Sequence, residues 1–424
     1  MKKFVALLLA LTLCIGLCAC GAQPDAPAAT DAPATEAPAE ETPAATGETE
    51  ATTGSKDIKV GFIFLHDENS TYDLNFINAA KAACAEVGLS DDQVMMKTNI
   101  SESQACYDAA AELVDAGCDL IITDSFGHES FALAAAKEFP EVHFVSCTGV
   151  KAHTEGLSNF HNAFASIYEG RYLAGVAAGL KLNEMIENGD ITAEEAKMGY
   201  VGAFPYAEVK SGYTSFFLGA RSVCPSVTME VTFTSSWYDE ALEKEAANKL
   251  INNGCVLISQ HADSMGAPTA CETAGVPNVS YNGSTVAACP NTFIVSSRID
   301  WTPFFVYAIN CVASGEDIGY DWTGTLATGS VVLTDVNEQA AAAGTAEKIA
   351  EVMKALEDGS VKVFDTATFT VNGETVTTYL ADVDDLGDYV GETEAISDGV
   401  FLESFYRSAP YFDLDIDGIT NLDA

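Results

Sequence analysis

A histidine and an aspartate lie two residues apart directly after a short apolar run, Val256–Ile258, which predicts a buried strand. Gln260 precedes His261, and Ser264 follows Asp263. Side chains of these types can act in catalysis, coordinate a metal, hydrogen-bond a ligand, or form an ordinary polar loop. The rest of the chain decides between these four interpretations.

Catalysis and metal binding need partners that the sequence does not supply. A hydrolase needs a nucleophile, a base and an orienting group in contact, and Ser264 is too close to His261 and Asp263 along the chain to complete such a triad. Neither a GxSxG nucleophile elbow nor an HExxH metal motif occurs, and the other histidines are scattered. The sequence therefore predicts a protein that is not an enzyme, with no catalytic residues, no metal site and no cofactor.

The segment before His261 occurs twice in the chain. Residues 109–121 align without gaps on residues 246–258, and both copies read as a helix, a Gly-Cys turn and a strand. Each copy leads into a polar loop, which is Thr123–His128 in the first. We interpret the match as two homologous α/β lobes; chance similarity between two generic βα units is the alternative.

Strand and helix patterns alternate at short spacing, which predicts an α/β fold with parallel sheets covered on both faces. The expected strands are 59–65, 94–97, 120–122, 142–145, 197–203, 229–233, 256–258 and 278–281, and the expected helices are 76–87, 104–116, 132–138, 211–223, 239–252 and 268–273. Ligands of such sheets bind beyond the carboxyl ends of the strands. Both polar loops lie there, so the two lobes are expected to form a cleft that closes on a ligand by a hinge motion.

The N-terminus reads as a targeting segment. A basic start is followed by an apolar run, Phe4–Leu17, and then by Cys18-Ala19-Cys20-Gly21, which looks like a bacterial lipobox with Cys20 as the lipidated residue. We expect a lipoprotein signal peptide over 1–20; a cleaved secretory signal without lipid is the alternative. Residues 21–56 are mostly Ala, Pro, Thr and Glu, which predicts a disordered spacer. The expected location is the extracytoplasmic face of the cell membrane, through a lipid anchor.

Charge and cysteine content exclude further classes. The formal net charge of −42 repels nucleic acid phosphates, so no nucleic acid partner is expected. Nine of the twelve cysteines follow the leader, in no CxxC pair and at scattered spacing. They resemble neither a disulfide framework nor a zinc site and are expected to pack as small buried side chains.

Several short motifs after residue 57 resemble the basic membrane protein (BMP) family, the nucleoside-binding lipoproteins of bacterial ABC importers. The motifs are Ser125–His128, Ala136–Pro140, Tyr168–Gly175, Ser236–Asp239, Gln260–Ser264 and Asp300–Phe305. The resemblance implies a type I periplasmic-binding-protein fold, in which two Rossmann-like lobes are joined by three hinge crossings. It places lobe 1 at 57–165 with a returning segment at about 292–424, and lobe 2 at 166–291.

The resemblance also implies partners. Family members deliver a small-molecule ligand to an ABC permease and carry out no chemistry. No GxxxxGK[ST] phosphate-binding loop occurs in this chain, so the ATPase is expected to be a separate subunit.

The family's ligand contacts carry over onto matching positions. A stacking aromatic from the first βα loop corresponds to Tyr72, and Asp73 lies where Asn is common. A lysine often found late in the site has only Arg298 as a loose match. The expected ligand-binding residues are Asp67, Tyr72, Asp73, Ser125, Phe126, His128, Phe204, Gln260, His261, Asp263, Asn282 and Gly283.

These residue types suit a purine nucleoside. A flat base stacks on aromatic rings, for which Tyr72, Phe126 and Phe204 are candidates, with simple core packing as the alternative. A carboxylate suits the ribose hydroxyls because charge-assisted hydrogen bonds are strong, and Asp263 is expected to take that role. Trp237 and Trp301 are expected to serve packing. The same receptor fold with a free nucleobase, a sugar or a signalling molecule as cargo, a nucleoside-acting surface enzyme, and a sensor or adhesion module remain alternatives.

Overall fold

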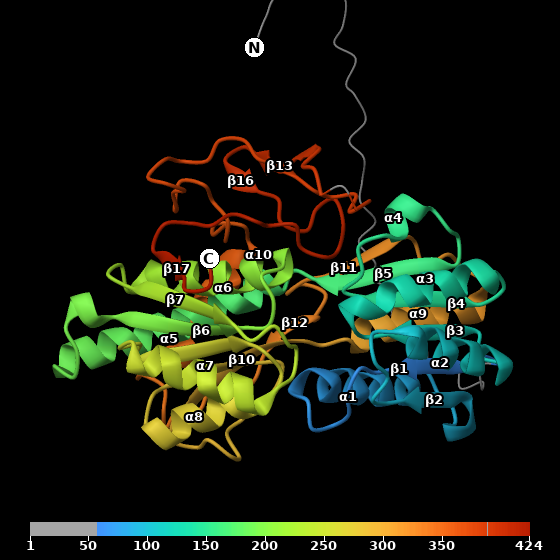
Figure 1. Cartoon of the computed structure of the whole chain (residues 1–424), viewed down its shortest axis with the longest axis horizontal. Coiled ribbons are helices and arrows are strands. Elements are labelled where there is room, and N and C mark those ends of the chain that lie inside the picture. Colours follow the sequence, from blue (N-terminus) through green and yellow to red (C-terminus); the bar gives the residue numbers. More distant parts are fainter. Residues whose placement is uncertain (1–56, 388) are drawn as a thin grey trace, which may run out of the picture. The chain divides into compact units, whose positions relative to one another are not determined.

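The computed structural model describes residues 57–387 and 389–424, in which two mostly parallel sheets each carry helices on both faces (Figure 1). The expected signal peptide, with Cys20, and the expected spacer at 21–56 lie outside the described residues. Within the described part, no helix is long and apolar enough to cross a membrane. The nine cysteines of this part are free and buried, as expected.

The first lobe is built on a sheet of six strands, all paired in parallel. Its inner strands are buried along their whole length, which is why they read as continuous apolar runs. In sheet order the strands are β11 (Asp321–Gly324), β5 (Phe160–Ala165), β4 (His143–Cys147), β3 (Leu120–Thr123), β1 (Val60–Ile63) and β2 (Val94–Lys97). The helices are α1 (Thr71–Glu86), α2 (Gln104–Asp115), α3 (Glu129–Glu138), α4 (Ala152–Glu155) and α9 (Thr302–Ser314).

The second lobe has a sheet of seven strands, parallel except for the antiparallel pair β10–β12. In sheet order these are β12 (Val331–Leu333), β10 (Phe293–Ile299), β9 (Asn278–Tyr281), β8 (Leu257–His261), β6 (Lys197–Gly202), β7 (Thr228–Phe233) and β17 (Ile419–Asn421). The helices are α5 (Ile167–Asn188), α6 (Ala207–Val223), α7 (Glu240–Asn252), α8 (Gly266–Ala274) and α10 (Thr345–Glu357).

The repeated segments have the same local structure in both lobes. Helix α2 leads into β3, and helix α7 leads into β8, through a glycine with φ of 85° at Gly117 and 87° at Gly254. Only glycine adopts this left-handed backbone without cost. Strands β3 and β8 then take the same place beside β1 and β6. The predicted architecture of two α/β lobes with parallel sheets is confirmed.

The expected return of residues 292–424 to the first lobe differs from the structure. Only α9 and β11 return, because β10, β12 and β17 all pair within the second sheet. The apolar pattern of β10 shows that it is a buried strand, but it cannot show which sheet edge the strand joins. The chain crosses between the lobes after β5, between β10 and α9, and between β11 and β12, which gives the three crossings implied by the resemblance.

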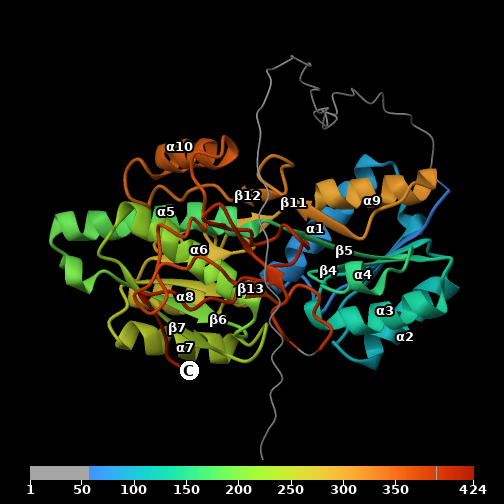
Figure 2. The same ribbon diagram turned by 90° about the horizontal axis from the view of Figure 1, so that it is seen from above.

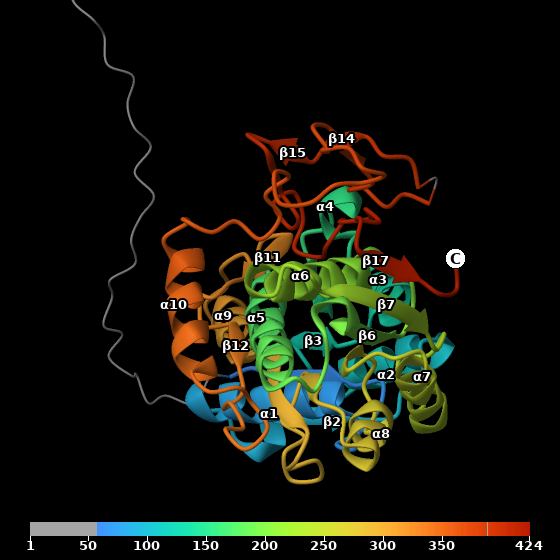
Figure 3. The same cartoon turned by 90° about the vertical axis from the view of Figure 1, so that its left-hand side faces the viewer.

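Residues 364–387 and 389–424, here called the C-terminal segment, contact both lobes. The segment lies over α4 and α6 in two perpendicular views (Figures 1 and 3). Ser408 N donates to Asp321 Oδ1 of the first lobe at 2.8 Å, and Lys210 of the second lobe pairs with Asp413 at 2.7 Å. The segment contains the short strands β13 (Leu380–Ala381), β14 (Thr393–Glu394), β15 (Ile396–Ser397) and β16 (Val400–Phe401), as well as β17.

Helices α5 and α6 pack with their backbones in contact (Figure 2). A Cβ atom on Gly175 would lie 2.0 Å from the Phe216 carbonyl oxygen, and one on Gly219 would lie 2.0 Å from the Tyr172 oxygen. Glycine is therefore required at both positions. This close packing holds the N-terminal half of α5, which carries Arg171, against the C-terminal half of α6.

Candidate ligand-binding site

A small cavity, here called the inner cavity, lies between the lobes at the carboxyl ends of their strands. Its volume is about 20 Å³. The first lobe contributes Leu65, Tyr72, Ser125, Phe126 and Thr148, and the second contributes Glu208, Trp237, His261, Asp263 and Tyr281. The loops singled out by the sequence repeat therefore meet across one cleft.

The cleft is closed, because groups of the two lobes bond directly across it. Thr71 donates from its backbone N and its hydroxyl to the Asp263 carbonyl oxygen, at 3.1 and 3.2 Å. Arg298, the loose match to the family lysine, donates to Asn75 Oδ1 at 3.3 Å. Ligand pockets are typically about 300–1,000 Å³, so a ligand of nucleoside size enters only when the lobes part at their crossings.

The first-lobe wall carries two aromatic rings, those of Tyr72 and Phe126. Helix α1 begins after Ser70, whose hydroxyl caps the helix by accepting from Asp73 N at 3.2 Å, and this places Tyr72 in the first turn. The Tyr72 hydroxyl donates to the Asp124 carbonyl oxygen at 2.6 Å, which fixes the ring. Phe126 follows β3 in a short 3₁₀ turn, and its ring centroid lies 5.6 Å from that of Tyr206 in the other lobe.

The second-lobe wall also carries two aromatic rings, Trp237 and Tyr281, but it alone carries carboxyl and imidazole groups. Burial raises the pKa of Asp263 well above its usual value, and the nearby Glu243 carboxylate raises it further. Asn282 Nδ2 donates to Asp263 Oδ1 at 3.3 Å. Burial, and next the Arg171 charge, lower the pKa of His261 to about 4, so its imidazole is neutral at neutral pH. His261 Nε2 lies 3.3 Å from Glu208 Oε1. Its Nδ1 has no hydrogen-bond partner among the described residues.

Arg171, from the Tyr168–Gly175 motif, supports this wall from behind. Its guanidinium carbon lies 3.3 Å from the ring centroid of Tyr281, a cation–π contact, and it donates to the Gln260 carbonyl oxygen at 3.1 Å. The side chain is buried and is not part of the cavity lining. It therefore positions Tyr281 and the end of β8.

Five of the residues expected from the sequence line the inner cavity: Tyr72, Ser125, Phe126, His261 and Asp263. Of these, Ser125 donates to Glu102 Oε1 at 2.6 Å, so its hydroxyl already has a partner in its own lobe. The expected residues outside the lining are Asp67, Asp73, His128, Phe204, Gln260, Asn282 and Gly283.

Most of the residues outside the lining have partners within the protein. Asp67 accepts from Asn69, Asp73 from the His66 backbone, and Gln260 from Asn278, while the ring of His128 hydrogen-bonds the Ile100 carbonyl oxygen. Phe204 stacks on Tyr206. Side chains alternate along a strand, so His261 faces the cavity and Gln260 points away from it. Asn282 acts on the site through its bond to Asp263.

The sequence interpretation missed three lining residues, Leu65, Thr148 and Glu208, and assigned Trp237 to packing alone. Thr148 could have been found, because it follows β4 as Ser125 follows β3. Glu208 lies in the first turn of α6, and only the packing of α6 brings it into the cavity. Trp301 is buried in the first-lobe core, 4.4 Å from the Phe76 ring, as the packing interpretation predicted.

A second and larger cavity, here called the outer cavity, adjoins the inner one. Its volume is about 410 Å³. It shares Phe126, Thr148 and Glu208 with the inner cavity. Much of its remaining wall comes from the C-terminal segment, including Tyr379, Asp382, Arg407 and Tyr411.

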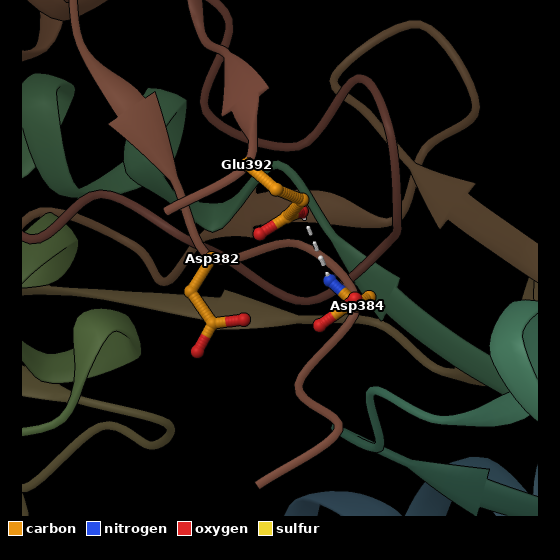
Figure 4. A group of neighbouring side chains, drawn as sticks. All are labelled: Asp382, Asp384 and Glu392. Carbon is orange, nitrogen blue, oxygen red and sulfur yellow. Dashed lines mark hydrogen bonds between the residues drawn. The ribbon is translucent and has the colours of Figure 1, made fainter. Parts of the chain in front are cut away.

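Among the described residues, one group of carboxylates could share a cation. Asp382, Asp384 and Glu392 have oxygens within 4.8 Å of one another (Figure 4). Glu392 accepts from the backbone N of Val383 at 2.9 Å and of Asp384 at 3.3 Å. These bonds explain the position of Glu392 as part of the turn, without a metal.

Comparisons with known proteins agree with this geometry. Residues 64–363 match the Bmp family of PnrA-like ABC transporter substrate-binding proteins. A purine-binding protein of Brucella abortus is 30% identical over 268 residues, covering 62% of this chain and 71% of that protein. A protein of Haloferax volcanii, named as a candidate ABC transporter glucose-binding protein, is 31% identical over 235 residues, covering 55% of this chain and 56% of its own length.

A solved structure has the same fold. A solute-binding protein of an ABC transporter system from Aeropyrum pernix K1 superposes with a TM-score of 0.60 at 17% identity, covering 75% of this chain and 94% of the other. Its identity is too low to carry more than the fold. The family match spans both lobes and the hinge crossings between them, and the chain therefore belongs to the Bmp family of ABC transporter substrate-binding proteins.

Proposed function

We propose that this substrate-binding protein captures a purine nucleoside in the inner cavity, at the extracytoplasmic membrane surface, and delivers it to an ABC permease driven by a separate ATPase subunit. One observation carries the proposal. Across the closed cleft, the rings of Tyr72 and Phe126 on one lobe face the buried carboxyl of Asp263 and the neutral imidazole of His261 on the other.

The two walls suit the two halves of a nucleoside. A base stacked on an aromatic ring gains about 1–3 kcal/mol, and the first-lobe wall offers such rings. The ribose carries hydroxyl donors, for which the Asp263 carboxylate is the acceptor.

The relatives support a small organic ligand without fixing which one. The Brucella abortus relative is named for purine binding, and the Haloferax volcanii relative for glucose. A sugar is therefore the second candidate, since it would also use the Asp263 carboxylate. It would leave the stacking wall less fully used, because a sugar has no flat aromatic base.

Binding without turnover is part of the proposal. The Ser125 hydroxyl already donates to Glu102, and His261 pairs with Glu208 rather than with a nucleophile. Incubation with labelled adenosine or guanosine should leave the nucleoside unchanged. Release of free base or a deaminated product would favour a surface enzyme instead.

Ligand identity is tested by denaturing the purified protein and analysing the released small molecules by mass spectrometry. The proposal predicts a purine nucleoside in the extract, and a raised melting temperature when nucleosides are added back. If no nucleoside or nucleobase is released and none raises the melting temperature, the proposed specificity is wrong. Release of a sugar would support the second candidate.

Anchoring through Cys20 is tested separately. The unchanged chain should incorporate labelled fatty acid and partition with the membrane fraction, because more than one acyl chain gives stable attachment. Cys20→Ser should remove the label and release the protein. A Cys20→Ser chain that still incorporates the labelled fatty acid would contradict the proposed anchor.

A further inference from the structure

The outer cavity is a feature that the family match does not cover. The match ends at residue 363, whereas the far wall of this cavity is formed by residues from 379–385 and 389–413 of the C-terminal segment. The segment is held against both lobes by the Ser408–Asp321 and Lys210–Asp413 bonds. The volume of about 410 Å³ is within the range of small-molecule pockets.

Thr148 lies where the two cavities meet, and its hydroxyl is unused. The residue is 3% exposed and lines both cavities, and its Oγ1 has no hydrogen-bond partner among the described residues. Its backbone has φ of 64°, a left-handed conformation that β-branched residues rarely adopt. Strained backbone and unsatisfied buried hydroxyls both concentrate at binding sites.

The lining of the outer cavity is acidic and aromatic. Asp382 and Asp385 contribute carboxylates, whereas Asp413 is already paired with Lys210 and Glu208 with His261. The cation in the wall is Arg407, and its guanidinium donates to the backbone carbonyls of Val383, Ala409 and Pro410 at 2.9–3.2 Å. Three of its five N–H donors are thereby occupied.

Aromatic faces surround these carboxylates. The lining includes Phe126, Tyr206, Tyr379 and Tyr411. Carboxylates together with aromatic rings favour an organic cation, through charge-assisted hydrogen bonds and cation–π contacts.

The residues that line one or both cavities indicate how the ligand is oriented. Asp263 lines only the inner cavity, whereas Phe126 lines both. If Asp263 binds the ribose and Phe126 stacks on the base, the base is the end of the nucleoside nearer to the outer cavity. We infer that the outer cavity receives a positively charged substituent carried on the base of the purine nucleoside, with Thr148 and Asp382 as contacts. This inference rests on the proposed function.

The test uses the full chain in detergent and isothermal titration calorimetry. Four probes are compared: adenosine, and adenosine carrying on its exocyclic amine an alkyl, an aminoalkyl or a carboxyalkyl group of equal chain length. The aminoalkyl probe, positively charged at neutral pH, should bind about ten-fold more tightly than the alkyl probe, as one charge-assisted contact provides. The carboxyalkyl probe should bind more weakly than both.

Two variants assign this preference to the cavity. Asp382→Asn keeps the side-chain shape but removes the charge, so the ratio of aminoalkyl to alkyl affinity should fall towards one. Asp398→Asn makes the same charge change on an exposed residue of the C-terminal segment outside the cavity lining, and it should leave the ratio unchanged.

The outcomes separate the inference from the function on which it rests. If adenosine binds but the three substituted probes bind equally, or if Asp398→Asn lowers the ratio as much as Asp382→Asn does, the inference is wrong and the proposed function stands. If no purine nucleoside binds, whether adenosine, guanosine, inosine or a substituted probe, the proposed function fails as well.

Discussion

The two lobes place different side chains at corresponding positions of the same scaffold. When the gapless alignment of residues 109–121 with 246–258 is continued past the strands, it pairs Asp124 with His261 and Phe126 with Asp263. At the second pair, one lobe presents a ring to the cavity and the other a carboxyl. A repeated βα unit has thereby become a cleft in which both walls carry aromatic rings, but only the second-lobe wall carries carboxyl and imidazole groups.

The first pair, Asp124 and His261, shows that a residue at an equivalent position of the repeat does not necessarily line the cavity. Asp124 accepts from Leu65 N at 3.1 Å, lies outside the inner cavity lining, and holds its own loop. Burial raises its pKa well above the usual value, whereas burial lowers that of His261 to about 4. Burial favours the neutral form of both groups, but only His261 faces the cavity.

A third correspondence concerns backbone strain. Thr148 directly follows β4 and Asn282 directly follows β9, with φ of 64° and 66°. Asparagine tolerates this left-handed conformation, and threonine does not. The second lobe therefore makes this turn without strain, and the first lobe does not.

The largest expected effect comes from removing the carboxyl of the second-lobe wall. Asp263→Ala should weaken nucleoside binding about 100-fold, because a buried charged hydrogen bond contributes up to about 3 kcal/mol. Binding of the free base should change little, and the melting temperature without ligand should not fall, since the change also removes a buried acid. Equal losses for adenosine and adenine in calorimetry would contradict ribose recognition by Asp263.

Removing the ring of the first-lobe wall should affect both ligands. Phe126→Ala should weaken adenosine and adenine binding alike, by about ten-fold, as the loss of one stacking contact predicts. Phe139→Ala, in the same lobe but lining neither cavity, is the matched control and should leave both affinities unchanged. A loss confined to adenosine would mean that the two walls do not divide the ligand as proposed.

The pH dependence of binding should show the role of Asp263, on the second-lobe wall, in a second way. Burial raises the pKa of Asp263 in the folded protein, and hydrogen bonds from ribose favour its ionised form, so binding releases a proton. Nucleoside affinity should therefore rise with pH between the usual aspartate pKa of about 3.9 and the raised pKa of Asp263. The rise should be at most about ten-fold per pH unit. Free-base affinity should lack this rise, and Asp263→Asn should abolish it.

The free energy of unfolding of the unliganded protein should change with pH in the opposite sense, because the Asp263 contribution to it falls as the pH rises. A carboxyl with a raised folded pKa contributes stability below its unfolded pKa, and this contribution is lost as pH rises through the folded pKa. Comparing urea unfolding of the unchanged chain and Asp263→Asn across the same window measures this contribution. If the unchanged chain instead becomes more stable relative to Asp263→Asn as the pH rises, the assigned direction of the Asp263 pKa shift is wrong.

The smallest effect is expected from copying the second-lobe turn into the first. Thr148→Asn should stabilise the unliganded protein by about 1 kcal/mol, because it relieves a left-handed conformation that costs threonine about 1–3 kcal/mol. The reverse change, Asn282→Thr, should destabilise by a similar amount. Urea unfolding checks both, and a destabilised Thr148→Asn chain would show that the turn is not strained.

Local sequence patterns were sufficient to predict the two lobes and part of the site. Periodicity and the Gly-Cys repeat located β3 and β8, so the loops after them could be expected at the cleft. Strand alternation could also have excluded Gln260. The lobe of β10 and the contribution of Glu208 depend on packing between distant segments, and no local pattern shows which sheet edge or cavity such residues reach.

The central claim is that the two walls together recognise a purine nucleoside. Its most direct test is calorimetric titration of the full chain with adenosine, guanosine and inosine, alongside adenine, ribose and glucose. The account predicts that at least one nucleoside binds more tightly than its own base and than either sugar, since only a nucleoside engages both walls. Binding of glucose or ribose with no detectable binding of any nucleoside would contradict it.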